Sequence, residues 1–172
     1  MSAALRETPP GIRLLVLDVD GVLTDGRLYF GSQGELLKVF HVRDGHGLKA
    51  LRASGVEVAV ISGRRSAAVQ RRCRELGIAH VIQGVADKLA AFQGLAARLG
   101  IAPAACACVG DDEPDVPLMR AVRLAYAVPD AHPAAQKAAH RITRLSGGQG
   151  AVREVCDELI QARRRMPRSR PT

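Results

Sequence analysis

The sequence predicts an α/β fold in which helices flank a mainly parallel β-sheet. Short runs of branched apolar residues alternate with amphipathic stretches along the chain, which is typical of repeated β–α units. The apolar runs have the length of strands that are buried inside a sheet. At 172 residues, the chain has the length of one globular domain.

Five of the apolar runs are predicted strands. The first, Leu14–Val19, leads into a cluster of acidic residues, and the second, Val56–Ile61, leads into a Ser-Gly-Arg sequence. Because helices separate the strands, a parallel arrangement is expected. The predicted strands are Leu14–Val19, Val56–Ile61, Val81–Gln83, Cys106–Val109 and Leu124–Ala127.

Four amphipathic segments predict helices. Asp44 is a candidate N-cap for a helix that runs to Ser54 and stops at Gly55, and the next two helices stop at Gly77 and Gly100. The last has apolar residues at helical spacing along one side, so it should pack on the domain. The predicted ranges are 44–54, 66–76, 88–99 and 151–165.

A β-hairpin is predicted between the first strand and the first helix. The segments 27–30 and 36–40 flank the turn-forming sequence Gly31-Ser32-Gln33-Gly34. Since the hairpin follows the first strand closely, it should lie as a flap beside the carboxyl end of that strand.

Composition indicates a folded, cytoplasmic protein that does not enter a membrane. Hydrophobic residues make up 47% and charged residues 24% of the chain, which excludes a disordered protein. No apolar run approaches the ~20 residues of a membrane helix, and residues 1–11 lack the apolar stretch of a signal peptide. We expect an N-terminal extension at 1–11, one domain at 12–162 and a disordered basic tail at 163–172.

The positive charge does not predict a nucleic-acid partner. The net charge is +8, but five arginines lie in the tail, and the remainder has 20 basic against 17 acidic residues. Aromatic residues are only 3% and there is no tryptophan, so a base-stacking platform is missing. The arginines in question are residues 163, 164, 165, 168 and 170.

Polar residues follow the predicted strands at the edge of the sheet where ligands bind in open α/β proteins. Singly, a D-x-D sequence, a lysine or a Ser-Gly turn is at least as often structural as functional. Together, and in strand order, they predict a site. They are Asp18-Val19-Asp20-Gly21, Ser62-Gly63-Arg64, Gly110-Asp111-Asp112 and, at the start of the third helix, Lys88.

Paired carboxylates can divide the work of displacement at phosphorus, because one attacks while the other transfers protons. We assign these roles to Asp18 and Asp20. Two like charges 4 Å apart repel by about 4 kcal/mol at an effective dielectric of 20, so a cation must offset them. Mg²⁺ suits oxygen ligands from Asp18, the Asp20 backbone carbonyl and Asp111. Lys88 and the Ser62 hydroxyl would neutralise the remaining phosphoryl oxygens.

The chain resembles the haloacid dehalogenase superfamily of phosphatases at four ordered motifs, which span Leu14 to about Asp115: Asp18-Val19-Asp20-Gly21-Val22, Ser62, Lys88 and Gly110-Asp111-Asp112. The resemblance implies a Rossmann-like fold, a Mg²⁺ cofactor and a phosphoenzyme on Asp18. It implies that Asp20 protonates the leaving oxygen and then activates water. The other implied roles are phosphate binding by Ser62, Gly63 and Lys88, metal binding by Asp18, Asp20 and Asp111, and support by Asp112 and Asp115.

A second resemblance covers nearly the whole chain. Segments 23–26, 40–45, 61–64 and 147–154 are similar to the family of 3-deoxy-D-manno-octulosonate 8-phosphate phosphatases. This implies a role in lipopolysaccharide precursor synthesis, no large cap domain, and a homotetramer whose neighbouring subunits close each site. The implied substrate-binding residues are His41, Val42, Arg43, Asp44, Gly45, Lys49, Arg64 and Arg72.

Departures from that family leave the substrate open. His41 stands where an Asn is usual, His46 where an aromatic residue is common, Lys49 at a usual arginine position, and Glu113-Pro114 in the fourth motif loop. A phosphatase of another acidic sugar phosphate, such as a sialic acid 9-phosphate, is the nearest alternative. A noncatalytic scaffold and a nucleic-acid binder are weaker ones. The run 147–150 is either a flexible loop or the lining of a neighbouring site.

Overall fold

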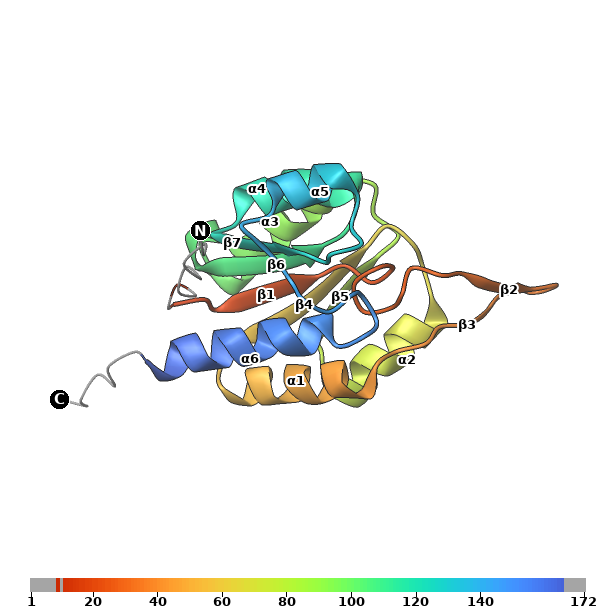
Figure 1. Cartoon of the computed structure of the whole chain (residues 1–172), viewed down its shortest axis with the longest axis horizontal. Helices are drawn as coiled ribbons and strands as arrows, with labels where there is room; N and C mark the ends of the chain where they lie inside the picture. Colours follow the sequence, from red (N-terminus) through yellow and green to blue (C-terminus); the bar gives the residue numbers. More distant parts are fainter. Residues whose placement is uncertain (1–8, 10, 166–172) are drawn as a thin grey trace.

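The computed structural model describes residue 9 and residues 11–165, and it contains a six-stranded parallel sheet between two layers of helices (Figure 1). The strand order is β5-β4-β1-β6-β7-β8, so β1 lies between β4 and β6. This confirms the predicted α/β class. The strands of this sheet are β1 (Leu14–Leu17), β4 (Glu57–Ser62), β5 (His80–Gln83), β6 (Cys106–Gly110), β7 (Leu124–Ala127) and β8 (Arg141–Ile142).

All five predicted strands are present, and the sheet has one strand more than predicted. β8 has only two residues in the sheet and pairs with β7, so no apolar run marks it in the sequence. Two short helices were also not predicted. The helices are α1 (Val42–Ala53), α2 (Ala67–Leu76), α3 (Lys88–Leu99), α4 (Val116–Ala121), α5 (Pro133–Ala138) and α6 (Ala151–Arg164), with 3₁₀ turns at Pro103–Ala105 and Glu113–Asp115.

Strand β1 is buried on both faces and divides the core into two layers. Leu15 and Leu17 point into the layer beneath α1, α2 and α6, whereas Leu14 and Val16 point into the layer beneath α3, α4 and α5. Successive side chains of a strand point to opposite faces, so a continuous apolar run is required here. This central position fixes the residue that follows β1 in the middle of the sheet edge.

The predicted hairpin is confirmed. It consists of β2 (Tyr29–Gly31) and β3 (Gly34–Leu37), joined by the two residues Ser32 and Gln33. Gly34 has a φ of +106°, which a side chain would disfavour. The hairpin projects away from the carboxyl ends of the parallel strands (Figure 1).

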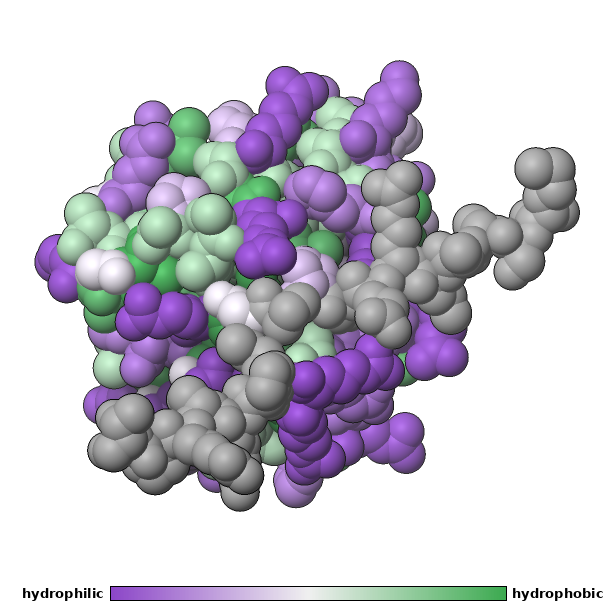
Figure 2. Space-filling view, turned by 90° about the vertical axis from the view of Figure 1, so that its left-hand side faces the viewer, coloured by the Kyte–Doolittle hydropathy of each residue, from purple (hydrophilic) through white to green (hydrophobic). Residues whose placement is uncertain are grey.

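The hairpin carries an exposed apolar surface, which we call the hairpin patch. On the visible part of the opposite end of the molecule, hydrophilic and hydrophobic residues are instead interspersed (Figure 2). Contiguous exposed apolar residues usually mark an interaction surface. The patch consists of Leu28, Tyr29, Phe30, Leu36, Leu37, Val39 and, at the start of α1, Val42.

The predicted helix ends are correct with one exception. α2 is capped by Ser66 and Gly77, and α3 ends at Gly100, with both glycines in the left-handed region. The prediction that Asp44 caps α1 is wrong, because His41 is the N-cap and its ring accepts the Arg43 amide. Asp44 lies inside the first turn of the helix, where its side chain serves a different element.

The predicted boundary of the basic tail is too early. Arg163 and Arg164 belong to α6, so they are helical rather than disordered. The remainder of that expected tail lies, from residue 166 on, outside the described residues, as does nearly all of the expected N-terminal extension. Among the residues that are described, none of the helices combines the length and the apolar character that a bilayer span requires.

Alanine substitutions at two helical glycines should change the stability of the protein in opposite directions. A Cβ at Gly47 of α1 would come 2.8 Å from Arg153 Cδ and 3.2 Å from Cys156 Cβ on α6, whereas a Cβ at exposed Gly94 of α3 would meet nothing within 4 Å. Gly47→Ala should therefore lower the free energy of unfolding by about 1–3 kcal/mol through overpacking. Gly94→Ala should raise it by up to about 1 kcal/mol through helix propensity. Urea denaturation of both variants checks this, and a Gly47→Ala variant as stable as Gly94→Ala would contradict the close α1–α6 packing.

Candidate active site

The polar residues that follow β1, β4 and β6 meet at one edge of the sheet. Asp18 follows β1, Ser62 ends β4 and Gly110 ends β6 directly before Asp111. Because these three strands are neighbours and parallel, their carboxyl ends lie together. The predicted convergence is therefore confirmed.

A buried lysine joins two carboxylates at the centre of this site. Lys88, the first residue of α3, has Nζ 2.9 Å from Asp18 Oδ1 and 2.7 Å from Asp115 Oδ1. All three side chains are less than a tenth exposed. Burial opposes the charged ammonium, but the two carboxylates outweigh it and raise the pKa of Lys88. The lysine is therefore a fixed positive charge beside the expected nucleophile.

Asp115 has a larger role than the expected support. Its Oδ2 accepts the backbone amides of Asp111 at 3.1 Å and of Asp112 at 3.2 Å, while its other oxygen contacts Lys88. One side chain thus holds the loop after β6 and orients the lysine. Asp112 is more peripheral, since its carboxylate accepts the Glu113 amide at the start of the 3₁₀ turn.

Asp111 completes a group of carboxylates that suits a divalent cation. Oxygens of Asp18, Asp111 and Asp115 lie within 4.8 Å of one another, and the buried Asp111 Oδ1 accepts no hydrogen bond from the described residues. Burial, reinforced by the charges of Asp18 and Asp115, raises the pKa of Asp111 to about 8. Burial also raises the pKa of Asp18 to about 6, with Lys88 acting against it. Hard oxygen donors that repel one another fit Mg²⁺.

The glycine after the D-x-D sequence makes room for this group. Gly21 has a φ of +88°, and a Cβ there would lie 2.0 Å from Asp111 Oδ2. Any side chain would displace the carboxylate that the cation needs. The D-x-D-G order thus has a steric cause.

The Gly-rich segment 147–150 packs on the catalytic loop of its own chain. The Gly148 amide donates to Val22 O at 3.1 Å, and a Cβ at Gly147 would lie 1.8 Å from Gly21 O. Of the two readings of this segment, the flexible loop is therefore wrong.

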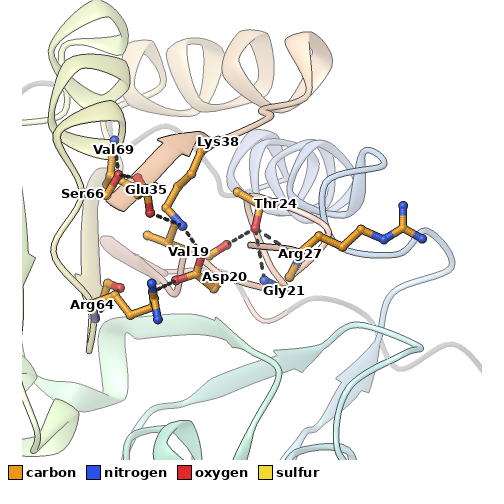
Figure 3. A network of polar contacts seen from close by, with 12 residues as sticks. Val19, Asp20, Gly21, Thr24, Arg27, Glu35, Lys38, Arg64, Ser66 and Val69 are labelled. Atoms are coloured by element: carbon orange, nitrogen blue, oxygen red, sulfur yellow. Dashed lines mark hydrogen bonds and ion pairs between the residues drawn. The ribbon is translucent and has the colours of Figure 1, made fainter. Parts of the chain in front are cut away.

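The carboxylate of Asp20 points toward Lys38 and Arg64 (Figure 3). Its Oδ1 accepts a hydrogen bond from Lys38, and its Oδ2 lies 3.8 Å from Arg64 Nε. The side chains grouped for a metal are thus those of Asp18, Asp111 and Asp115, while Asp20 was expected to contribute only its backbone carbonyl.

Sequence reasoning missed Lys38 and Glu35, which lie on the hairpin and reach this site. Lys38 is 3.2 Å from Glu35 Oε2, and Glu35 accepts a hydrogen bond from the Ser66 hydroxyl (Figure 3). A signal was present, since two opposite charges three residues apart interrupt an otherwise apolar hairpin strand. The charge pattern did not identify the partner of Lys38, because Asp20 precedes Lys38 by 18 residues.

The residues expected to bind phosphate lie at the sheet edge, and those expected to bind the substrate lie in two different surroundings. Ser62 is buried, and its Oγ accepts the Arg64 amide at 3.2 Å, beside Gly63. A small pocket between α1 and α2 is lined by several expected substrate residues, among them His41, Asp44, Gly45 and Arg72. The exposed residues Val42, Arg43 and Lys49 on α1 do not line this pocket.

Asp44 serves the structure rather than the cleft. It is 1% exposed, and its Oδ1 accepts the Arg153 amide at 2.7 Å. Burial raises the pKa of Asp44, and the bond from Arg153 acts in the opposite direction. Since the N-cap of α6, Gly150, has no side chain, Asp44 caps α6 from α1. This placement argues against a direct substrate contact.

Comparisons with known proteins identify relatives that match most of the chain. A family model described as haloacid dehalogenase-like hydrolase matches residues 77–154. The 3-deoxy-D-manno-octulosonate 8-phosphate phosphatase KdsC of Escherichia coli K12 is 51% identical over 162 residues, which cover 94% of this chain and 86% of the relative. The protein of the same name from Salmonella typhi is 53% identical over 151 residues, covering 88% and 80%.

Solved structures that are similar to this chain include phosphatases of the same name. The phosphatase of that name from Moraxella catarrhalis, in complex with a magnesium ion, a phosphate ion and a KDO molecule, has a TM-score of 0.87 and 45% identity, covering 90% of this chain and 88% of the other. A cobalt-bound form from Haemophilus influenzae has a TM-score of 0.86 and 40% identity, covering 88% and 89%.

The raised carboxyl pKa values predict how pH and Mg²⁺ affect stability. Asp111 and Asp18, which face Lys88 and Asp115, have pKa values of about 8 and about 6 instead of 3.8, so the folded state binds more protons than the unfolded state. Without metal, stability should therefore fall as the pH rises through this range. A divalent cation favours the ionised carboxylates, so added Mg²⁺ should raise the Tm more at about pH 8 than at about pH 5. Calorimetry with Mg²⁺ or a chelator checks this.

Asp111→Asn is the matched control for that measurement. The amide does not ionise, so the variant should lose most of the difference between the two pH values. An equal Mg²⁺ effect at both pH values in the unsubstituted protein would contradict the proposed cation site.

Proposed function

Because the chain belongs to the family of 3-deoxy-D-manno-octulosonate 8-phosphate phosphatases within the haloacid dehalogenase-like hydrolases, we propose that it hydrolyses this sugar phosphate to 3-deoxy-D-manno-octulosonate and phosphate. The observation that carries the proposal is the group of Asp18, Asp111 and Asp115, in which the buried Asp18 and Asp115 both pair with Lys88. This arrangement suits a reaction in which a dianionic phosphate binds beside acidic side chains, because a divalent cation can bind to both.

The first half of the reaction transfers the phosphoryl group to the enzyme. A carboxylate oxygen of Asp18 attacks phosphorus, the bond from phosphorus to the sugar oxygen breaks, and Asp20 gives its proton to that oxygen. Lys88 and the Ser62 hydroxyl hold the remaining phosphoryl oxygens, and Lys88 neutralises the charge that accumulates there. The product is an aspartyl-phosphate on Asp18.

The second half regenerates the enzyme. Asp20, now a carboxylate, takes a proton from a water molecule that attacks phosphorus, and the bond from phosphorus to Asp18 breaks. Phosphate leaves and both aspartates return to their starting states. When bound by Asp18, Asp111 and Asp115, with the Asp20 backbone carbonyl as a further ligand, Mg²⁺ would supply charge that offsets the crowding of anions in the site.

We assign recognition of the sugar acid to cations around the cleft. Arg64 is 44% exposed and its guanidinium lies 5.7 Å from the centre of the Phe30 ring, so it is held at the hairpin side of the site. Arg72 lines the pocket between α1 and α2 together with His41. A planar guanidinium can bind a carboxylate with two parallel hydrogen bonds, which suits an acidic sugar.

Assembly into a homotetramer would complete the site. Residues 11–165 contain no large cap domain, and the hairpin patch leaves apolar side chains exposed. Burying the patch against neighbouring copies would stabilise the assembly and cover the open side of each cleft. We place the enzyme in the cytoplasm, in lipopolysaccharide precursor synthesis, as the resemblance to its family implies.

Turnover of purified protein on a panel of phosphorylated sugars with Mg²⁺ tests the substrate. The highest kcat/KM is expected for 3-deoxy-D-manno-octulosonate 8-phosphate, and Asp18→Asn should abolish turnover while far-UV circular dichroism stays unchanged. A higher kcat/KM for a sialic acid 9-phosphate would favour the alternative, and an Asp18→Asn variant within about tenfold of the unsubstituted rate would remove Asp18 from its role.

Arg64→Ala and Arg72→Ala test recognition of the sugar acid. Each should raise KM for the sugar phosphate by about 10-fold or more, because lost charge-assisted hydrogen bonds are worth about 1.5–3 kcal/mol. The KM for p-nitrophenyl phosphate should change much less, since that ester lacks the acid group. Exposed Arg71→Ala on α2 is the matched control. Equal effects on both esters would refute the assignment.

Leu36→Asp tests the assembly. Leu36 is 69% exposed at the hairpin patch, so the change should not disturb the fold of one chain but should oppose its burial between copies. Analytical ultracentrifugation should record smaller species, with turnover reduced more on the sugar phosphate than on the generic ester. A monomer that keeps full efficiency on the sugar phosphate would contradict a shared site.

A further inference from the structure

A lysine of the hairpin is buried against the acid–base residue of the site. The Lys38 side chain is 2% exposed, and its Nζ donates a hydrogen bond to Asp20 Oδ1 (Figure 3). Burying an ammonium group costs several kcal/mol unless charged or polar partners surround it. The contact with Asp20 is therefore unlike a surface ion pair, whose partners remain solvated.

Lys38 is itself held by a second set of contacts. Glu35, three residues earlier on β3, places Oε2 3.2 Å from Lys38 Nζ. The other Glu35 oxygen accepts a hydrogen bond from the hydroxyl of Ser66, which is the N-cap of α2. The Ser66 amide in turn donates to Gln83 Oε1 on β5 at 2.8 Å. These contacts link the sheet, α2 and the hairpin to one carboxylate.

The two oxygens of Asp20 have different surroundings. Oδ1 is held by the buried lysine, whereas Oδ2 lies 3.8 Å from Nε of the half-exposed Arg64. That distance is beyond a hydrogen bond, and a guanidinium with this exposure can move when substrate binds. One oxygen is therefore fixed, and the other stays available on the side of the cleft.

We propose that Lys38 is a positioning residue for the proposed phosphatase reaction. Lys38 holds Asp20 Oδ1, so that Asp20 Oδ2 gives its proton to the leaving oxygen and then takes a proton from water. Glu35 in turn orients Lys38. The inference rests on the proposed function, because it assigns Lys38 a part in the proton transfers of that reaction. Reacting groups must be held close to their working geometry, and small misplacements reduce rates strongly.

The need for proton transfer differs between substrates, so a role of Lys38 in orienting Asp20 can be distinguished from a merely structural role. When the bond from phosphorus to a sugar oxygen breaks, the alkoxide needs the proton of Asp20. A p-nitrophenolate leaves as a stable anion and does not need it. Misplacing Asp20 should therefore slow the first step for the sugar phosphate only, and slow the hydrolysis of the aspartyl-phosphate for both esters.

The experiment compares single-turnover cleavage of the two esters by Lys38→Met with Mg²⁺ present. We expect first-turnover cleavage of the sugar phosphate to fall on the order of 10–100-fold, while that of p-nitrophenyl phosphate stays within about threefold of the unsubstituted enzyme. With the aryl ester, a burst of nitrophenolate equal to the enzyme concentration should precede a slow steady state. Lys137→Met, the same substitution at an exposed position on α5, should leave the first-turnover rate of both esters unchanged.

Glu35→Gln provides a second variant if Lys38→Met does not fold. The amide can still accept the Ser66 hydroxyl but no longer pairs with the lysine charge, so the same selective loss should appear with smaller size. Equal losses of first turnover on both esters, or no loss on either, would overturn the proposal. If the unsubstituted protein does not hydrolyse the sugar phosphate, the proposed function fails, and a simple alkyl phosphate replaces it in the test of Lys38.

Discussion

The site depends on two ion pairs that Lys88 forms, one with Asp18 and one with Asp115. These side chains are buried where β1 and β6 end, in the part of the sheet that has neighbouring strands on both sides. Breaking one partner out of a buried ion pair costs about 3–5 kcal/mol, because the remaining charge is left without compensation. The lysine therefore holds Asp18, the proposed nucleophile, and the β6 loop together. The same loop then presents Asp111, whose unsatisfied oxygen completes a site for a hard cation.

Close backbone packing holds the catalytic loop against this charged centre. Gly21 allows the Asp111 carboxylate to approach, and Gly147 allows the segment before α6 to lie on Gly21. The amide of Gly148 bonds to the same loop, and Asp44 caps the helix that follows. α6 is thus connected to the loop after β1 through structural contacts. Its sequence resemblance to phosphatases at 147–154 is explained by this structural support.

The hairpin would connect the proposed assembly with the proposed chemistry. Its outer apolar residues form the hairpin patch, while Glu35 and Lys38 on the same element reach Ser66 and Asp20. A neighbouring copy that orders the patch would therefore also order the residues that hold Asp20. A small fold without a cap domain can in this way acquire a covered site and an oriented acid–base group from one hairpin.

The sequence by itself determined the chain order of five of the six sheet strands, the hairpin and four of the helices in the described residues, and most of the residues at the sheet edge. Apolar runs and glycine stops are local signals, and parallel strands bring their carboxyl ends together, so Asp18, Ser62, Lys88 and Asp111 could be placed without coordinates.

Only the tertiary structure decided the contacts between distant segments. Asp44 meets Arg153, which is 109 residues away, and Lys38 meets Asp20 across the base of the hairpin. The two-residue strand β8 depends on pairing with β7 rather than on any apolar run of its own. Such contacts have no periodic signal, because the chain reversals that bring the partners together set their distances.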